Sequence, residues 1–295
     1  MLSEKLKEYS GITDEALKKL FLPDGITPPH MQEVMSYSVM AGGKRLRPAL
    51  VLAACETLGG DRQRALPFAC AIELIHTYSL IHDDMPCIDN DTMRRGRPTS
   101  HVMFDEQRAL LAGDALLSYA FEIMLDAVVN SGEREMAAAA AAAKAIADAA
   151  GTRAMVAGQW QDVLSEGKRI SPQELEYIHV HKTADMIRGA VRAGALIAGA
   201  KEETLTCFDE YALRIGLAFQ IADDILDVVG DAEKLGKNTG SDAADNKVTY
   251  VSLHGLEESR RISRELIGQA CRIIKSMDET GFFTELAHFI IERVN

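Results

Sequence analysis

Two groups of aspartates in the sequence have the side-chain type and the spacing to bind a metal ion together with a phosphate-bearing substrate. The first group follows an apolar segment and contains Asp83 and Asp84, with Asp89 shortly after them. Clustered carboxylates suit Mg²⁺, which is bound by one or two carboxylates together with substrate phosphate oxygens. An aspartate pair is also common on solvated surfaces, so this group alone does not distinguish a metal site from an exposed loop.

The second group of aspartates lies on a predicted helix. Gln220, Asp223, Asp224 and Asp227 are spaced i, i+3, i+4 and i+7, which places them on one helical face. Apolar residues flank these positions, and no lysine or arginine is interleaved among them. Three carboxylates on such a face repel each other and are costly to hold there without a bound cation. The second group therefore predicts a cation site and supports the same interpretation of the first.

Basic residues accompany both aspartate groups. The segment 42–48 is a glycine turn that leads into a predicted helix, with Lys44, Arg45 and Arg47 beside the helix N-terminus. Backbone N–H groups, the helix dipole and cationic side chains at such a place favour phosphate. Further cations lie near one of the aspartate groups or between them: Arg94, Arg95, Lys182 and Lys237.

Helix-forming patterns dominate the chain and must position these residues. Thr13 predicts a helix N-cap, and Pro67 predicts the start of a helix that continues to Pro86. The alanine-rich segment 137–150 predicts a closely packed helix, because alanine is the best helix former. Alternating strand patterns are nearly absent. The sequence therefore predicts an all-α fold, a bundle of roughly ten or more helices in a single domain covering residues 1–295.

Composition restricts the classes of function. The chain has 295 residues, of which 47% are hydrophobic, so it can bury a large core. Its net charge of −12 at pH 7 makes it unsuited to binding nucleic acid. No apolar run approaches the ~20 residues that span a membrane, and the N-terminal residues lack the apolar core of a signal peptide. Five scattered cysteines argue against a disulfide framework. We therefore expect a cytoplasmic protein in which local cations and metal ions offset the negative charge at a phosphate site.

These motifs stand in the order typical of the trans-prenyl diphosphate synthases, and the chain resembles that family from about Met35 to Tyr250. The matching segments are GGKRLRP, HTYSLIHDD with its later aspartate, RRG, HKT, FQIADDILD and LGK. The resemblance is closest to bacterial-type farnesyl diphosphate synthases (geranyltranstransferases). It implies a helical bundle around a central substrate cavity and a homodimer. It also implies Mg²⁺ as cofactor, with about three ions per site and Mn²⁺ as a substitute.

The resemblance implies a role for each matching side chain. The aspartates would bind Mg²⁺ from two walls: Asp83 and Asp89 from one, supported by Asp84, and Asp223 from the other, with Asp224 and Asp227 as direct or water-mediated partners. The allylic diphosphate and the reacting carbons would be contacted by Arg94, Lys182, Thr183, Gln220 and Lys237. Isopentenyl diphosphate would be held by Lys44, Arg47, His76 and Arg95.

The implied reaction is the head-to-tail condensation of isopentenyl diphosphate with dimethylallyl or geranyl diphosphate, which gives farnesyl diphosphate and diphosphate. The allylic diphosphate ionises, the double bond of isopentenyl diphosphate attacks the cation, and a proton is lost, with the released diphosphate as its acceptor. Tyr78 and Ser79 precede the first aspartate group and would set the product length. Ser79 leaves room for the product tail, and Tyr78 would close the floor. We expect His82 to have a structural part.

Other interpretations remain open at this point. The same chemistry could give geranyl or geranylgeranyl diphosphate, and Tyr78 could be an ordinary core aromatic. A His-Asp metal phosphohydrolase is suggested by His82 and Asp83 but leaves the second aspartate group unexplained. A terpene cyclase would normally carry a mixed Asn/Ser/Glu second motif. An inert regulatory subunit of a prenyl synthase would not be expected to keep both aspartate groups intact.

Overall fold

The computed structural model describes residues 2–229 and 248–292, and helices make up nearly all of the regular structure there. The helices are α1 (Leu2–Leu20), α2 (Pro29–Val39), α3 (Leu46–Thr57), α4 (Arg62–Asp83), α5 (Ser100–Met103), α6 (Glu106–Val129), α7 (Glu133–Ala150), α8 (Met155–Ser165), α9 (Pro172–Ile178), the π-helical η1 (His179–Ala184), α10 (Asp185–Ile197), α11 (Glu202–Val229), α14 (Tyr250–His254), α15 (Leu256–Ile274) and α16 (Phe282–Glu292). The prediction of an all-α fold is confirmed. None of the described helices is long and apolar enough to cross a membrane.

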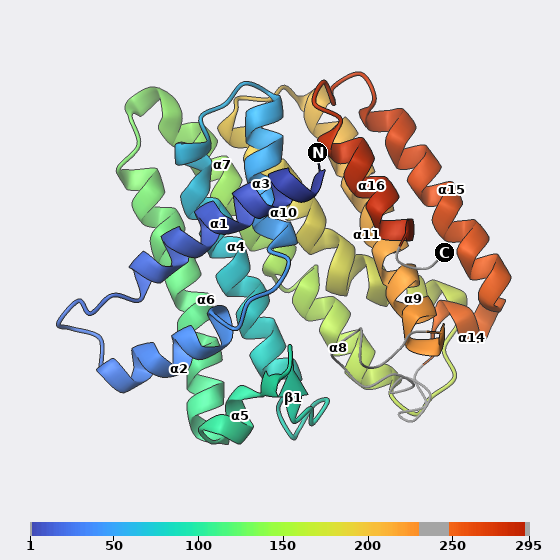
Figure 1. The fold of residues 1–295 in the computed structure, drawn as a ribbon, viewed down its shortest axis with the longest axis horizontal. Coiled ribbons are helices and arrows are strands. Elements are labelled where there is room, and N and C mark those ends of the chain that lie inside the picture. Colours follow the sequence, from blue (N-terminus) through green and yellow to red (C-terminus); the bar gives the residue numbers. More distant parts are fainter. Residues whose placement is uncertain (1, 230–247, 293–295) are drawn as a thin grey trace.

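One short antiparallel hairpin interrupts the helices, and the sequence patterns did not indicate it. Its strands are β1 (Met93–Arg94) and β2 (Arg97–Pro98), and Met93 pairs with Pro98. The hairpin follows the first aspartate group and lies near α5 (Figure 1). It therefore brings the basic residues of this segment to the end of the bundle where α4 ends.

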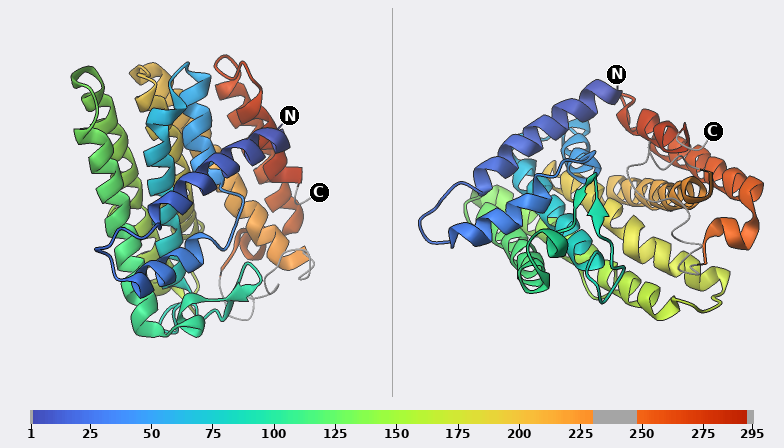
Figure 2. Two further views of the ribbon diagram at one scale, coloured as in Figure 1. Left: turned by 60° about the vertical axis from the view of Figure 1, so that its left-hand side comes forward. Right: turned by 60° about the horizontal axis from the view of Figure 1, so that its bottom comes forward.

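The bundle is built around α10. This helix packs against α3, α4, α7 and α11, while α6 packs on α4. On the other side, α15 and α16 cover α11 (Figure 1). Helix α1 runs obliquely across the neighbouring helices (Figure 2). The C-terminal ends of α4 and α11 point toward the same end of the bundle (Figure 1). The first aspartate group begins at the last residue of α4, and the second lies within α11.

Small residues let the helices around α10 approach closely. A Cβ at Gly189 of α10 would lie 2.5 Å from the Cβ of Ala149 on α7, and a Cβ at Gly194 would lie 2.0 Å from the carbonyl oxygen of Val51 on α3. The buried face of α7 is formed by alanines and one isoleucine: Ala139, Ala142, Ile146, Ala149 and Ala150. The prediction of a closely packed alanine-rich helix is confirmed.

Two predicted helix boundaries are wrong. Thr13 lies inside α1, fully buried, and its hydroxyl donates to the carbonyl of Tyr9 at 2.8 Å. A hydroxyl that binds the carbonyl four residues back is satisfied within a helix. Helix α4 begins before Pro67, because the side chain of Asp61 caps it by accepting from the amide of Gln63. Pro67 is tolerated inside α4 at the loss of one backbone hydrogen bond.

Candidate active site

A cavity of about 480 Å³ lies between α4, α8 and η1. Its apolar lining comes largely from α8: Met155, Val156, Trp160, Val163 and Leu164. Eight of the residues singled out from the sequence also line it: Arg47, His76, Tyr78, Ser79, His82, Asp83, Lys182 and Thr183. Two buried donors of this lining, Nε of Arg47 and Nε2 of Gln159, reach no acceptor in the described part of the chain. Such donors suit a polar or anionic ligand.

The adjacent Asp83 and Asp84 have different surroundings. Asp84 is 3% exposed, and Nε of Arg94 donates to its two carboxylate oxygens at 2.7 and 2.9 Å. Asp83 faces the cavity, where Nζ of Lys182 lies 3.9 Å from its carboxylate. Burial raises the pKa of Asp83 to about 6, although Lys182 acts in the opposite direction. Asp83 is therefore placed to take a cation, while Asp84 holds Arg94.

Lys182 is shared between two carboxylates. Its Nζ donates to Oδ2 of Asp162 at 2.6 Å, in addition to the longer contact with Asp83. Burial would lower the pKa of Lys182, but Asp83 and Asp162 outweigh this effect and raise it. Lys182 therefore stays positively charged inside the site. Asp162 and Gln159 were not predicted from the sequence, although a carboxylate on the largely apolar helix α8 was an available signal.

The π-helical segment η1 presents Lys182 and Thr183 to the cavity. π-Turns occur often at functional sites because they change the direction of side chains within a helix. Gly158 of α8 allows η1 to come close, since a Cβ there would lie 2.2 Å from the backbone nitrogen of Lys182. The hydroxyl of Thr183 donates to Oε1 of Gln220 at 3.0 Å. This bond connects η1 to α11, the helix of the second aspartate group.

The second aspartate group lies along α11, as its spacing predicts. Asp224 is 3% exposed and accepts from the backbone nitrogen of Tyr250 at 2.9 Å and from Nε2 of Gln220 at 3.3 Å. Asp227 is also buried, whereas Asp223 is partly exposed. Among these three carboxylates, Asp223 is the most accessible to a cation.

His179 and Tyr250 form a stacked pair beside Asp224, and the sequence motifs predicted a part in the site for neither of them. Their ring centroids are 5.3 Å apart, and Nε2 of His179 lies 3.8 Å from Asp224. Burial lowers the pKa of His179 to about 4. The pair holds η1 and α14 against the helix that carries Asp224.

Arg45 is buried, although the sequence predicted that it would face a phosphate at the N-terminus of α3. It adopts a left-handed conformation, with φ of 46°, and turns into the core, where its side chain is 1% exposed. Its guanidinium donates to Glu73 at 2.7 Å, to Asp14 at 2.8 Å and to the carbonyl of Val39 at 2.6 Å. The segment 42–48 was predicted to hold three phosphate-binding cations, and this prediction is wrong for Arg45. Its side chain anchors the turn instead.

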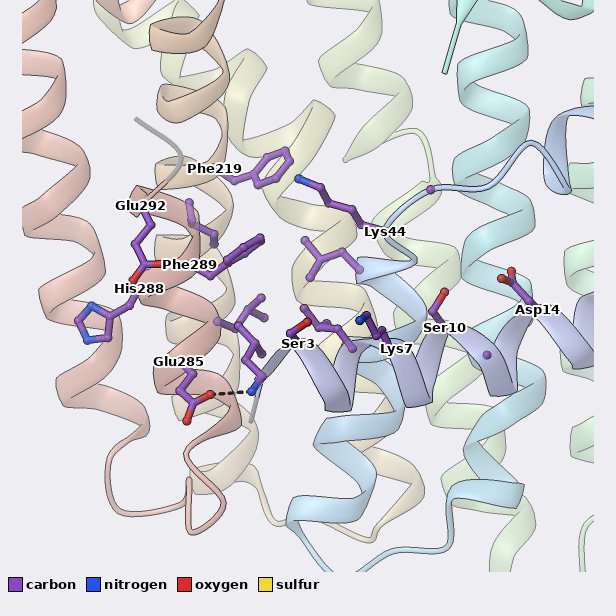
Figure 3. Close-up of a pocket in the computed structure, with 17 residues that line it drawn as sticks. Ser3, Lys7, Ser10, Asp14, Lys44, Phe219, Glu285, His288, Phe289 and Glu292 are labelled. Carbon is purple, nitrogen blue, oxygen red and sulfur yellow. Dashed lines mark hydrogen bonds between the residues drawn. The ribbon is translucent and has the colours of Figure 1, made fainter. Parts of the chain in front are cut away.

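Lys44 and Arg47 face different cavities. A larger cavity, of about 920 Å³, lies between α1, α11 and α16, and Lys44 reaches into it toward Phe219 (Figure 3). Its Nζ lies 5.6 Å from the ring centroid of Phe289. Arg47 lines the 480 Å³ cavity together with His76. Burial lowers the pKa of His76 well below its usual range, and Arg47 adds to this effect.

Arg95 fastens the hairpin to the glycine turn. Its guanidinium donates to the carbonyl of Gly42. Gly43 has φ of +132°, and a Cβ there would lie 2.8 Å from Cζ of Arg95, so only glycine fits this contact. Tyr37 of α2 holds the second strand by donating to the carbonyl of Pro98 at 2.9 Å. The turn and the hairpin are thus held together beside the end of α4.

Tyr78 and Ser79 lie on the wall of the cavity formed by α4. Tyr78 is 7% exposed, and burial raises its pKa to about 12, with a further contribution from Asp83. The hydroxyl of Ser79 donates to the carbonyl of His76 at 2.9 Å. The side chains at both positions could therefore affect the depth of the cavity.

The donor set fits Mg²⁺ bound together with a diphosphate. No three histidine, cysteine, aspartate or glutamate side chains of the described ranges converge to hold a metal ion alone. Mg²⁺ needs only a few carboxylates when phosphate oxygens complete its shell. Asp83 and Asp223 have the accessibility for this part, and Asp89 lies close enough to Asp83 to raise its pKa. Lys237 lies outside the described residues.

Comparisons with known proteins show the family of this chain. Residues 28–280 match the polyprenyl synthetase family. A geranylgeranyl diphosphate synthase from Cyanophora paradoxa is 45% identical, covering 98% of this chain and 96% of that protein. A farnesyl diphosphate synthase from Geobacillus stearothermophilus is 47% identical, covering 86% and 85% respectively.

Solved structures of similar proteins share the fold over nearly the whole chain. A synthase from Zymomonas mobilis described as an FPP/GFPP synthase has a TM-score of 0.85 at 35% identity, covering 98% of both chains. A geranyltransferase from Helicobacter pylori, solved with magnesium and isoprenyl diphosphate, has a TM-score of 0.84 at 31% identity, covering 98% of this chain and 96% of the other. With the family match over residues 28–280 and a relative that is 45% identical over nearly its whole length, this chain belongs to the polyprenyl synthetase family.

Proposed function

We propose that the chain catalyses the Mg²⁺-dependent head-to-tail condensation of isopentenyl diphosphate with dimethylallyl or geranyl diphosphate, with farnesyl diphosphate as the main product. One observation carries this proposal. The same 480 Å³ cavity contains the charged groups of Asp83 and Lys182, 3.9 Å apart, and an apolar lining formed by α8 together with Tyr78. Such a cavity has separate places for a diphosphate with its metal ions and for a hydrocarbon tail.

The charged residues act on the two diphosphates. Lys182 stabilises the charge that develops on the allylic diphosphate as it leaves, because its ammonium is fixed in place before the reaction. Mg²⁺, held by Asp83 and Asp223, would neutralise further charge on the same leaving group. Arg47, whose buried Nε is in need of an acceptor, holds the diphosphate of isopentenyl diphosphate with His76 beside it.

The apolar residues protect the allylic cation. Met155, Val156 and Val163 of α8 exclude water from the part of the cavity where the cation forms. Thr183 and Gln220, bonded to each other, present fixed dipoles nearby. The released diphosphate then accepts the proton that is lost from the new carbon chain.

A second candidate product is geranylgeranyl diphosphate, formed by the same chemistry. The small side chain of Ser79 and the 45% identity to a geranylgeranyl diphosphate synthase favour it. Tyr78, which is bulky and nearly buried in the cavity wall, favours the shorter product. The two candidates differ only in where the tail stops.

We propose further that the active form is a homodimer. Leu111, Leu125 and Val129 of α6 are 63, 58 and 66% exposed, and their spacing places them on one helical face. A second copy of the chain would remove this apolar face from water. Light scattering after size-exclusion chromatography measures the molar mass in solution and so tests for the homodimer. A molar mass equal to that of one 32.2 kDa chain would contradict the proposal.

The decisive experiment incubates the purified protein with dimethylallyl diphosphate, labelled isopentenyl diphosphate and Mg²⁺, with and without EDTA. A fifteen-carbon product that EDTA abolishes is the expected result. A twenty-carbon product would keep the reaction and replace farnesyl by geranylgeranyl diphosphate. Release of diphosphate without a condensation product would overturn the proposal in favour of a hydrolase, or of a cyclase if farnesyl diphosphate alone releases it.

A further inference from the structure

His82 is fixed between two helices beside the wall of the catalytic cavity. It lies one turn after Tyr78 on α4, and the two rings meet edge to face at a centroid distance of 5.6 Å and an interplanar angle of 82°. On the other side, its Nε2 lies 3.1 Å from the carbonyl oxygen of Leu110 on α6. A carbonyl only accepts, so Nε2 carries a proton and donates it.

Gly113 of α6 leaves the space that this imidazole occupies. A Cβ at Gly113 would lie 2.1 Å from Nε2 and 2.5 Å from Cδ2 of His82, so no larger residue fits while the ring stays where it is. Glycine inside a helix is unfavourable compared with alanine. Here it permits the ring of His82 to pack directly against the backbone of α6.

We propose that His82, seated against Gly113, is a positioning residue that sets product length by fixing the ring of Tyr78. The hydrogen bond to Leu110 and the absence of a side chain at Gly113 fix the imidazole, and its edge-to-face contact fixes the tyrosine. Both Tyr78 and His82 line the cavity, so a change in either ring changes the space for the hydrocarbon tail. The inference rests on the proposed condensation and on Tyr78 as the floor of the cavity.

The main test compares the product lengths made by the wild-type chain and by His82→Ala. Removal of the imidazole opens space beside Tyr78 and frees its ring. We compare the amount of product that is one isoprene unit longer with the amount of the main wild-type product. We expect this ratio to rise about tenfold, because the loss of an aromatic contact can change a free energy by the corresponding amount. His82→Gln, whose amide can still donate to Leu110 but has no ring, should shift the distribution less than His82→Ala.

Gly113→Ala supplies the opposite change. The new Cβ pushes the imidazole away from α6 and toward the cavity, so we expect shorter products than those of the wild type. Gly189→Ala is the matched control: its Cβ would lie 2.5 Å from that of Ala149, but it does not line the catalytic cavity. It should lower the melting temperature and leave product length unchanged.

The products of each variant are compared with those of the wild type, whatever length the wild-type product has. A twenty-carbon wild-type product would therefore overturn the proposed fifteen-carbon product and leave the test of His82 intact. Parallel shifts in His82→Ala and in Tyr78→Ala, smaller than additive in the double variant, would support the inference. An unchanged product distribution in His82→Ala, with a lowered melting temperature, would overturn it and leave His82 with a purely structural part.

Discussion

Lys182 donates a hydrogen bond of 2.6 Å to Asp162, a residue of α8 that no motif in the sequence had indicated. The same ammonium lies 3.9 Å from the carboxylate of Asp83, the proposed metal ligand. Asp162 therefore keeps Lys182 from forming a closer ion pair with Asp83. This arrangement leaves the oxygens of Asp83 accessible to Mg²⁺ while the lysine remains charged beside it.

Asp162→Asn should raise the Mg²⁺ concentration needed for half-maximal condensation by about tenfold. Without the charge of Asp162, Lys182 moves toward Asp83 and competes with Mg²⁺ for that carboxylate. Titration of activity with Mg²⁺ measures the effect. Asp148→Asn is the control, because Asp148 pairs with the exposed Lys144. An Mg²⁺ requirement equal in the two variants would show that Asp162 does not keep Lys182 away from Asp83.

Asp83→Ala and Asp223→Ala should each reduce turnover by at least about a thousandfold, because each removes a carboxylate that we propose as a ligand of the metal ion bound by the leaving diphosphate. Steady-state assays at saturating Mg²⁺ test this. Circular dichroism checks that the fold is kept, and Asp24→Ala, on an exposed loop, provides the background value. Turnover within tenfold of the wild type in either variant would rule out that residue as a metal ligand.

Tyr78→Ala should lengthen the products, and Ser79→Phe should shorten them. The first change removes a nearly buried ring from the wall of the cavity, and the second adds a ring beside it. Chromatography of the dephosphorylated products measures chain length. Tyr119→Ala, which changes a tyrosine of α6 away from this cavity, should keep the wild-type distribution. If Tyr78→Ala also keeps it, Tyr78 is a core aromatic and does not set the length.

Arg45→Met should lower the free energy of unfolding by about 3–5 kcal/mol, because Glu73 is left charged and buried without its partner. Urea unfolding measures the change. Adding Glu73→Leu to the same chain should restore much of the stability, since the unpaired charge is gone. Arg261→Met, at an exposed pair with Glu258, should leave the unfolding midpoint unchanged. A loss in Arg45→Met as small as in Arg261→Met would contradict the structural role of Arg45.

Acid should destabilise the fold through His76. Burial and the neighbouring Arg47 and Arg95 lower the pKa of His76 in the folded chain, so the unfolded chain binds more protons as the pH falls below about 6.5. The contribution of the His76 imidazole to the free energy of unfolding is therefore present above that pH. It is lost as the pH falls below it, at up to about 1.4 kcal/mol per pH unit. Unfolding curves between pH 7 and 5 measure the slope. We expect a smaller slope in His76→Gln, and an identical slope would exclude the assignment.

The sequence predicted those parts of the site that depend on spacing within one element. The i, i+3, i+4, i+7 pattern on α11 required only helical geometry, and the glycine turn before α3 required only a positive φ. Lys182 and Thr183 were found because they belong to a matching motif. These predictions needed no knowledge of how the helices pack.

The remaining parts depend on contacts between distant elements. Arg45 turns inward because Glu73 and Asp14, on two other helices, accept its hydrogen bonds, and nothing in the segment 42–48 distinguishes it from Lys44. Asp162 meets Lys182 only because α8 packs against η1 at a glycine. Tertiary contacts of this kind leave no periodic pattern in the sequence.

The π-helical segment between α9 and α10 has a consequence for changes in chain length. One residue turns a helix by about 100°, so deleting a single residue within 179–184 would rotate everything after it relative to everything before it. Helix α10 is held by α3, α7 and α11 and cannot follow such a rotation. Lys182 and Thr183 would have to absorb it, and they would leave the cavity even when neither of them is the residue deleted. The direction in which Lys182 points is thus encoded in the number of residues in this segment as well as in their identities.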